Sequence, residues 1–332
     1  MKAIFLGDST NINRVFSKQI TQELIKKANL DTTVYTKEQI ISGSLDTRNV
    51  DYIFSTWGMN VFAEDEIKAF FPNLKAVFYA AGTVQYFAKP FLKCGVKVFS
   101  AWAANAVPVA EYTVAQIVLA NKGFYKVSDL ASVGKYADAV EVFSNYMGNY
   151  DAKVGIIGAG MIGKLVIEML RAYRLDILVF DPFLSDEKAL EIGVEKCSLE
   201  RIFSECNVIS NHLANNAETK RMLNGDLFSL MLPYATILNT GRGAQIVEED
   251  LIKTLTERPD ITAILDVTEP EPPQIDSAFY KLNNCILTPH IAGSAGQELN
   301  RMSEYMLDEF KRFIDNKSLR YEVTEKMLET MA

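Results

Sequence analysis

The chain has 332 residues, 48% of them hydrophobic and 23% charged, and a formal net charge of −8. This length suffices for two domains with separate cores, and the composition is that of an ordinary soluble globular protein. The acidic balance disfavours binding to nucleic acid, no apolar run reaches the length of a membrane span, and the N-terminus enters a strand pattern without a signal peptide, so we expect a cytoplasmic protein.

The first hundred residues alternate short strand-like runs with helical patterns. Strands are expected at residues 2–6, 32–35, 52–55, 76–79 and 96–99. Helical spacing lies between them at residues 12–27, 64–71 and 84–92. Alternation of this kind predicts a parallel sheet covered by helices.

Two loops of this region, residues 56–59 and 80–84, follow expected strands. Functional loops of parallel sheets follow the carboxyl ends of the strands. The segment 80–84 contains Gly82 and is expected to open a helix, so its backbone N–H groups are candidates for holding a carboxylate. An ordinary glycine turn explains the same residues equally well.

A helical pattern starts at residues 105–108 and runs to about Gly123. Pro108 suits the first turn of a helix, where its missing N–H is not needed. This helix is expected to carry the chain into a second domain. Residues 125–150 are polar and aromatic with weak periodicity, and we interpret them as an arm or long loop at a subunit interface.

The strongest motif is the stretch KVGIIGAGMIGKLVIEMLR at residues 153–171. A short apolar run meets Gly158, Gly160 and Gly163 in G-x-G-x-x-G spacing, and a helical pattern follows. The first glycine permits a tight turn, the second a close approach of the backbone to a pyrophosphate, and the third close packing of helix on strand. A second strand at 177–180 ends at Asp181, near the spacing expected for an acid that binds the adenosine ribose. The sequence therefore predicts a dinucleotide site.

The second domain continues with strands expected at 208–210, 236–239, 262–265 and 285–288, and with helices at 198–204 and 248–257. A long helical pattern at 294–316 then crosses back, and residues 319–324 are expected to add to the first domain. Polar residues gather where these strands end. They are Asp181, Asn211, His212, Thr240, Arg242, Asp266 and His290.

Two of these residue types, arginine and histidine, suit a nicotinamide dehydrogenase. Arg242, between two glycines, can offer a planar fork to a substrate carboxylate. His290 can exchange the carbonyl or hydroxyl proton near neutral pH, provided that an acid orients its other ring nitrogen. Glu269 and Glu271 are both candidates for that acid, and composition does not choose between them. His212 has no acid nearby in sequence and is expected to line the cofactor crevice.

The chain resembles the D-isomer-specific 2-hydroxyacid dehydrogenase family over essentially its whole length. The resemblance is strongest in VGIIGAGMIG, NTGRGAQIVEEDL, LDVTEPEP and LTPHIAGS. It implies that Arg242 binds substrate, that His290 is the catalytic acid/base, and that Glu271 rather than Glu269 supports it. It also implies a loop at Ala81, Gly82 and Thr83 that binds the substrate carboxylate.

The same resemblance implies an NAD site, with Asp266 orienting the carboxamide. The expected cofactor-binding residues are Gly158, Gly160, Met161, Ile162, Gly163, Asp181, His212, Thr240, Asp266 and Gly293. Asp181 favours NADH over NADPH, because it would repel a 2′-phosphate. No metal site is expected, and the four scattered cysteines are interpreted as reduced thiols.

The implied fold is α/β, with two Rossmann-like or flavodoxin-like domains built on doubly wound parallel sheets. A cofactor domain at 104–294 is expected to interrupt a substrate domain made of 1–103 and 295–332. The implied reaction is NADH-dependent reduction of a small 2-oxo acid to the D-2-hydroxy acid in a homodimer. Alternatives are an NAD-sensing, corepressor-like binding protein and a dehydrogenase of another small anion.

Two departures from the family pattern leave the substrate open. Gly82-Thr83-Val84 stands where the family more usually has Gly-Val-Asp, and Ala214 stands where proline is common.

Overall fold

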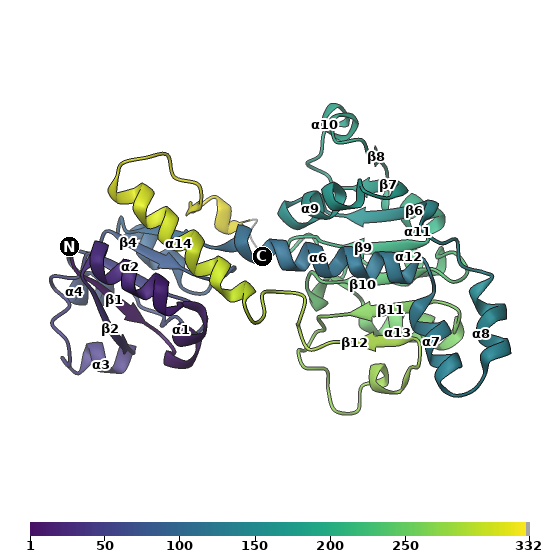
Figure 1. The fold of residues 1–332 in the computed structure, drawn as a ribbon, viewed down its shortest axis with the longest axis horizontal. Helices are drawn as coiled ribbons and strands as arrows, with labels where there is room; N and C mark the ends of the chain where they lie inside the picture. Colours follow the sequence, from purple (N-terminus) through teal and green to yellow (C-terminus); the bar gives the residue numbers. More distant parts are fainter. Residues whose placement is uncertain (330–332) are drawn as a thin grey trace. The chain divides into compact units, whose positions relative to one another are not determined.

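Two largely parallel β-sheets, one in each of two structural units, form the framework of the chain (Figure 1). The structure is a computed structural model that describes residues 1–329. Unit 1 consists of Met1–Asn105 and the chain from Ser294 onward, and unit 2, Ala106–Gly293, is inserted in sequence between these parts. The expected α/β class with parallel sheets and interleaved helices is confirmed.

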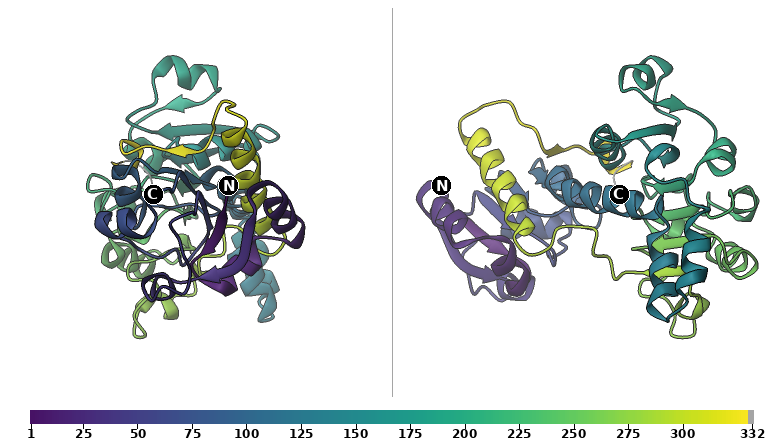
Figure 2. Two further views of the ribbon diagram at one scale, coloured as in Figure 1. Left: turned by 90° about the vertical axis from the view of Figure 1, so that its left-hand side faces the viewer. Right: turned by 45° about the vertical axis from the view of Figure 1, so that its right-hand side comes forward.

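The sheet of unit 1 has the strand order β2-β1-β3-β4-β5-β13, and only β13 is antiparallel to its neighbour. The order 2-1-3-4-5 is that of flavodoxin-like sheets. The strands are β1 (Ala3–Leu6), β2 (Leu30–Tyr35), β3 (Tyr52–Ser55), β4 (Ala76–Tyr79), β5 (Lys97–Ser100) and β13 (Glu322–Val323). The helices are α1 (Ser9–Val15), α2 (Lys18–Ala28), α3 (Lys37–Ile41), α4 (Glu64–Phe70), α5 (Ala88–Lys93) and α14 (Glu298–Ile314). After α14 the chain, yellow in Figure 2, returns to place β13 beside β5.

Both faces of this sheet are buried, because successive side chains of each strand point to opposite sides. Phe54 and Phe78 stack at 5.1 Å between ring centroids and meet Phe310 of α14 on one face. Ile53 and Val77 pack on the other face in a second apolar cluster. Helices therefore cover both sides of the sheet, and functional loops are left at the strand ends.

The sheet of unit 2 is entirely parallel, in the order β8-β7-β6-β9-β10-β11-β12. The order reverses between β6 and β9, which makes that point the topological switch where ligands of doubly wound sheets bind. The strands are β6 (Tyr150–Ile157), β7 (Arg174–Phe180), β8 (Glu195–Lys196), β9 (Val208–Asn211), β10 (Thr236–Asn239), β11 (Thr262–Leu265) and β12 (Cys285–Leu287). The helices are α6 (Trp102–Ala120), which begins in unit 1, α7 (Phe124–Ser132), α8 (Tyr136–Phe143), α9 (Met161–Leu170), α10 (Asp186–Glu191), α11 (Leu199–Glu205), α12 (Gly225–Ser229) and α13 (Glu248–Glu257).

Several expected helix bounds are wrong. The single helix expected at 12–27 is two helices, because Ser17 caps the start of α2 by accepting a hydrogen bond from the Ile20 N–H at 3.3 Å. Helix α5 begins at Ala88, so the loop 80–84 does not open a helix directly. Helix α6 begins at Trp102, which places Pro108 inside the helix rather than in its first turn.

Residues 125–150, expected to be an arm or long loop, contain the helices α7 and α8. Gly134, at φ 80°, lies in the turn between them. Their facing sides leave an apolar groove of about 350 Å³. The groove is lined by Leu119, Lys122, Phe124, Val127, Ser128, Ala131, Tyr136, Ala139, Val140 and Phe143. Some apolar side chains of α7 and α8 pack within the chain, and others are exposed. This division weakens the helical spacing of apolar residues by which a helix is predicted from sequence.

Helix α6 also corrects the expectation that no apolar run is long enough to span a membrane. By length and composition, with a mean hydropathy of 1.2, it could cross one. Its Ala110 and Ile117 are fully buried among residues of β6 and α9, and core helices have the same composition. Packing against β6 and α9 therefore explains part of the apolar character of the helix.

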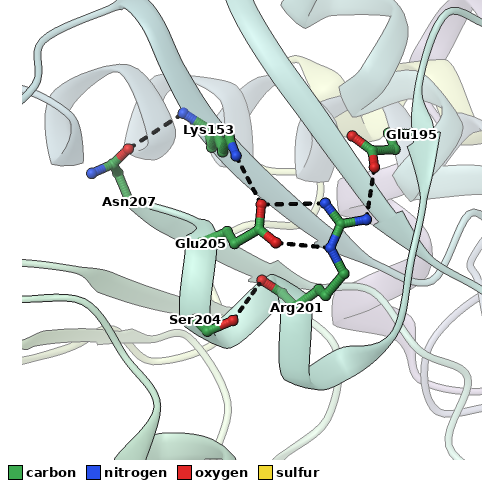
Figure 3. Close-up of polar contacts among 6 residues, drawn as sticks. All are labelled: Lys153, Glu195, Arg201, Ser204, Glu205 and Asn207. Carbon is green, nitrogen blue, oxygen red and sulfur yellow. Dashed lines mark hydrogen bonds and ion pairs between the residues drawn. The ribbon is translucent and has the colours of Figure 1, made fainter.

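An ion-pair network fastens α11 to the neighbouring strands of unit 2 (Figure 3). Arg201 donates to both oxygens of Glu205 and also to Glu195, and Lys153 of β6 donates to Glu205 at 2.8 Å. These hydrogen bonds hold the pKa of Glu205 at about 2. Asn207 adds a hydrogen bond to the Lys153 backbone N–H at 3.3 Å.

Candidate active site

The glycine turn lies between β6 and α9, at the topological switch of unit 2. Gly158 has a φ of 94°, and a Cβ there would lie 2.8 Å from the His212 carbonyl oxygen. A Cβ at Gly163 would lie 2.0 Å from the Gly158 oxygen, so helix and turn touch backbone to backbone. A Cβ at Gly160 would meet no atom within 4 Å. The surface above Gly160 is therefore open to a ligand.

Asp181 is fixed at the end of β7 by the glycine turn itself. Its Oδ2 accepts a hydrogen bond from the Ala159 N–H at 2.7 Å, and its Oδ1 accepts one from the Phe183 N–H at 2.7 Å. Each carboxylate oxygen can accept a second hydrogen bond. The carboxylate is thus placed beside the turn with capacity for the hydroxyls of a ribose.

His212 follows β9 and is buried directly against the glycine turn. Its Nε2 lies 2.9 Å from the Ser210 hydroxyl, whereas its Nδ1 is buried with no hydrogen-bond partner in the described structure. Burial lowers the pKa of His212 to about 3. The imidazole is neutral near pH 7, so His212 is unsuited to giving a proton there.

A frame of three buried amide side chains holds the backbone around Arg242. Asn211 donates to Asn239 at 2.9 Å and to Gln245 at 2.5 Å. Asn239 donates to the Arg242 carbonyl at 3.1 Å, and Gln245 accepts from the Arg242 N–H at 3.2 Å. Sequence reasoning noted Asn211 only as a strand-end residue and missed Asn239 and Gln245. Their signal was the recurrence of amides on both sides of Thr240-Gly241-Arg242-Gly243.

The Arg242 side chain is half-buried, and its Nη1 donates to the Gly241 carbonyl at 2.7 Å. Burial lowers the pKa of the guanidinium, and the negative charge of Glu271 acts in the opposite sense. Arginine nevertheless keeps its charge in proteins. At Gly243 a Cβ would lie 2.0 Å from the Thr268 carbonyl carbon, so this glycine lets the arginine turn pack against the loop that carries Glu271.

Asp266 ends β11 and binds the loop that presents His290. Its Oδ1 accepts hydrogen bonds from the Thr288 hydroxyl at 2.6 Å and the Ile291 N–H at 2.8 Å, and its Oδ2 accepts one from the Ala292 N–H at 2.9 Å. The side chain is buried. Three of its roughly four acceptor positions are used within the protein. Its main role in this structure is to position the loop.

His290 lies on this loop with a φ of 55°, a left-handed conformation that is uncommon for residues other than glycine. Its Nδ1 lies 2.7 Å from Oε1 of Glu271, and both side chains are partly exposed, at 46% and 41%. The neighbouring Glu269 is held differently, through its backbone N–H, which donates to Glu248 at 2.8 Å. The structure therefore pairs His290 with Glu271.

The remaining expected residues of unit 2 lie around the same sheet edge. Met161 and Ile162 form the first turn of α9. The Thr240 hydroxyl is buried 3.4 Å from that of Thr113 in α6. Gly293 is the last residue of unit 2. None of the described residues forms a cluster of three His, Cys, Asp or Glu side chains able to hold a metal ion.

In unit 1, Ser100 at the end of β5 holds the loop that follows β4. The buried Ser100 hydroxyl lies 2.8 Å from the Ala81 carbonyl and 2.5 Å from the Gly82 carbonyl, and the Ala101 N–H donates to Ala81 at 3.0 Å. These contacts all involve backbone carbonyl groups of the loop. The helix that follows, α5, begins only at Ala88, so this loop is not itself a helix terminus.

Comparison with known proteins identifies unit 2. Residues 114–292 match the family model described as D-isomer specific 2-hydroxyacid dehydrogenase, NAD binding domain. YoaD of Bacillus subtilis, a protein that carries the name of a 2-hydroxyacid dehydrogenase, is 32% identical over 61% of this chain and 59% of its own length. D-3-phosphoglycerate dehydrogenase of Archaeoglobus fulgidus is 29% identical over 60% of this chain and 37% of its own length. The chain thus spans less than two-thirds of both curated relatives.

The fold is also found in solved structures. Apo D-mandelate dehydrogenase of Rhodotorula graminis matches with a TM-score of 0.81, covering 98% of this chain and 97% of that one. At 18% sequence identity, this likeness speaks for the fold alone.

Proposed function

Because the chain belongs to the D-isomer specific 2-hydroxyacid dehydrogenase family, we propose that it reduces a small 2-oxo acid to the D-2-hydroxy acid, using NADH in a reversible reaction. The observation that carries the proposal is the 2.7 Å contact between His290 Nδ1 and Glu271. The negative charge of Glu271 also acts on Arg242, where it raises the pKa of the guanidinium against the effect of burial. In this proposal His290 is the proton donor and Arg242 the carboxylate-binding cation, and both act at the same sheet edge.

The residues around the glycine turn fit a dinucleotide. The open space above Gly160 admits a pyrophosphate, and the first turn of α9, with Met161, Ile162 and Gly163, offers N–H groups to its charge. The buried, unpartnered Nδ1 of His212 is an atom that a ligand could satisfy. Further cofactor contacts are proposed for residues of the same sheet edge. They are Gly158, Asp181, Thr240, Asp266 and Gly293.

When bound, the nicotinamide cofactor would supply the hydride for the carbonyl carbon. His290 would give its Nε2 proton to the carbonyl oxygen, because the Nδ1–H is engaged by Glu271. Glu271 would fix the tautomer and stabilise the charged imidazole. In the reverse direction the same nitrogen would take the hydroxyl proton.

Arg242 would bind the substrate carboxylate and polarise the carbonyl group. A planar guanidinium can donate two parallel hydrogen bonds to a carboxylate. The amide frame of Asn211, Asn239 and Gln245 would fix the backbone from which that side chain extends. In unit 1, the loop of Ala81, Gly82 and Thr83 is proposed to hold the carboxylate through backbone N–H groups.

NADH is the proposed cofactor in preference to NADPH. Both oxygens of the Asp181 carboxylate accept backbone hydrogen bonds, one from Ala159 in the glycine turn and one from Phe183 after β7, so the side chain cannot easily swing away. Its negative charge would repel a 2′-phosphate and accept hydrogen bonds from a free ribose hydroxyl.

The proposal extends to a homodimer in the cytoplasm, with neither nucleic acid nor a membrane as partner. The α7–α8 groove exposes apolar side chains such as Phe124, Tyr136 and Val140, which are 47%, 71% and 59% exposed. Patches of this kind on a protein surface mark interaction sites. A second copy of the chain is the occupant that the proposal assigns to it.

The test is NADH oxidation by the purified protein with a panel of small 2-oxo acids. Turnover with at least one of them, and formation of the D product on a chiral column, is expected. NADH binding without turnover on any member would favour an NAD-sensing protein. Turnover only with other small anions would favour a dehydrogenase of a different substrate class.

A further inference from the structure

Tyr86 follows the loop that is proposed to hold the substrate carboxylate, three residues after Thr83. Its side chain is 46% exposed, whereas the neighbouring Tyr79, at the end of β4, is 1% exposed. The two hydroxyl oxygens lie 3.2 Å apart. One buried and one exposed phenol thus share a hydrogen bond at the carboxyl edge of the unit 1 sheet.

The direction of this hydrogen bond follows from burial. A buried hydroxyl that does not donate a hydrogen bond destabilises the fold, while an exposed hydroxyl can donate elsewhere. The hydrogen-bond partner of the Tyr79 hydroxyl is Tyr86. We therefore assign Tyr79 as the donor and Tyr86 as the acceptor. Burial raises the pKa of both phenols, so both keep their protons at neutral pH.

A hydroxyl can accept two hydrogen bonds and donate one. Because Tyr86 accepts from Tyr79, its own hydrogen is not used in that bond. The Tyr86 side chain is exposed, so its O–H is left to donate outward.

The Tyr86 ring is also held in place. It lies edge-on to the buried Phe87, with the ring centroids 5.0 Å apart, and Phe87 in turn contacts Tyr79 at 4.9 Å. The loops after β3 and β4 are tied to each other as well, because the Thr56 hydroxyl donates to the Ala80 carbonyl at 2.8 Å. The outward O–H therefore comes from a fixed ring on a fixed loop.

We infer that Tyr86 determines substrate specificity by donating a hydrogen bond to an oxygen on the side chain of the 2-oxo acid. The inference rests on the proposed function and narrows its substrate class to 2-oxo acids that carry a hydroxyl or carboxylate beyond the carbonyl carbon. An alkyl side chain would leave the phenol without an acceptor. A site built to hydrogen-bond a substrate oxygen discriminates against analogues that lack it.

The test compares wild type with Tyr86→Phe on two pairs of nearly matched substrates. Hydroxypyruvate and 2-oxobutyrate differ by a hydroxyl against a methyl group, and 2-oxoglutarate and 2-oxohexanoate differ by a distal carboxylate. Wild type is expected to prefer the oxygen-bearing member of at least one pair. The variant should lose about tenfold in kcat/KM for that member, the worth of one hydrogen bond, and less than twofold for its alkyl partner.

Tyr173→Phe is the matched control, because Tyr173 is 39% exposed at the amino end of β7. Thermal unfolding of each variant separates lost recognition from lost folding. Equal changes for both members of a pair, or a wild type without preference, would overturn the inference while leaving the proposed function intact. If wild type reduces no member of either pair and no other 2-oxo acid, the proposed function fails and the inference fails with it.

Discussion

Oε1 of Glu271 lies 2.7 Å from Nδ1 of His290, although the two residues come from different loops of unit 2. Each loop is fixed by separate contacts. Asp266 binds the histidine loop through three hydrogen bonds. Gly243 allows the arginine turn to pack against the backbone of Thr268, at the start of the glutamate loop. The pair is therefore a product of the fold and not of a flexible encounter between side chains.

Removing the imidazole should abolish most of the turnover. For His290→Ala we expect kcat to fall by roughly two to four orders of magnitude, the range for losing general acid catalysis, with little change in NADH affinity. Glu271→Gln should cost less and should move the alkaline fall of the reduction rate to lower pH. Glu269→Gln is the matched control and should behave as wild type. A pH–rate profile that responds to Glu269 instead would transfer the supporting role to that residue.

Arg242→Lys should behave as a severe change. Lysine keeps the charge but loses the planar fork, and a hydrogen bond to a charged group is worth roughly 1.5–3 kcal/mol. We expect kcat/KM to drop about tenfold to a hundredfold. Methyl esters of the substrate should narrow the difference between the two proteins. Arg221→Lys, on an exposed arginine that pairs with Glu249, is the control. Equal reduction of acid and ester by both proteins would remove Arg242 from carboxylate binding.

Cofactor choice can be tested at Asp181. Wild type is expected to show at least tenfold higher kcat/KM with NADH than with NADPH, about 1.4 kcal/mol of discrimination. Asp181→Asn retains one oxygen acceptor but removes the charge, so the preference should shrink. Asp186→Asn, in the first turn of α10, serves as the control. A wild type that uses both cofactors equally well would contradict the role given to this carboxylate.

His212 should make stability depend on pH. Its pKa is about 3 in the folded chain and about 6.5 when exposed, so the unfolded state binds the extra proton between these values. Stability is then complete above pH 6.5 and is lost as the pH falls, with a slope approaching about 1.4 kcal/mol per pH unit. His212→Gln removes this contribution. Urea unfolding of both proteins without cofactor, at pH 7.5 and pH 5, should show the smaller pH dependence in the variant. Parallel curves would mean that the histidine is charged when folded.

The oligomeric state tests the groove between α7 and α8. Val140→Asp places a charge in the groove and should convert a dimer into a monomer in light scattering at micromolar concentration. Val133→Asp is matched in chemistry and exposure, at 64% against 59%, but Val133 does not line the groove. Dissociation by both variants, or by neither, would argue for another interface.

The sequence contained enough local information to predict the strands that form the two sheets. Short, nearly continuous apolar runs predicted the strands 52–55, 76–79, 236–239 and 262–265 with the bounds of the structure, because each is buried on both faces. The glycine turn was equally readable, because Gly158 and Gly163 meet backbone atoms where no side chain fits.

Contacts between residues that are far apart in the chain could not be predicted from the residues alone. Glu269 and Glu271 share the same proline-rich composition, and only the path of the loop brings Glu271 to His290. In the sequence, Asn239 and Gln245 cannot be told from exposed polar residues, because their burial depends on the fold. The helices α7 and α8 were missed because much of their apolar surface is not covered by other described residues of the chain.

The amide frame around Arg242 has a consequence for how the protein responds to its surroundings. Asn211, Asn239 and Gln245 neither gain nor lose protons in the physiological range, and all three are fully buried. The anchoring of the arginine should therefore be insensitive both to acidity and to dissolved salt, which screens exposed charges but not buried dipoles. The backbone from which the Arg242 side chain extends should then keep the same geometry when acidity or salt changes.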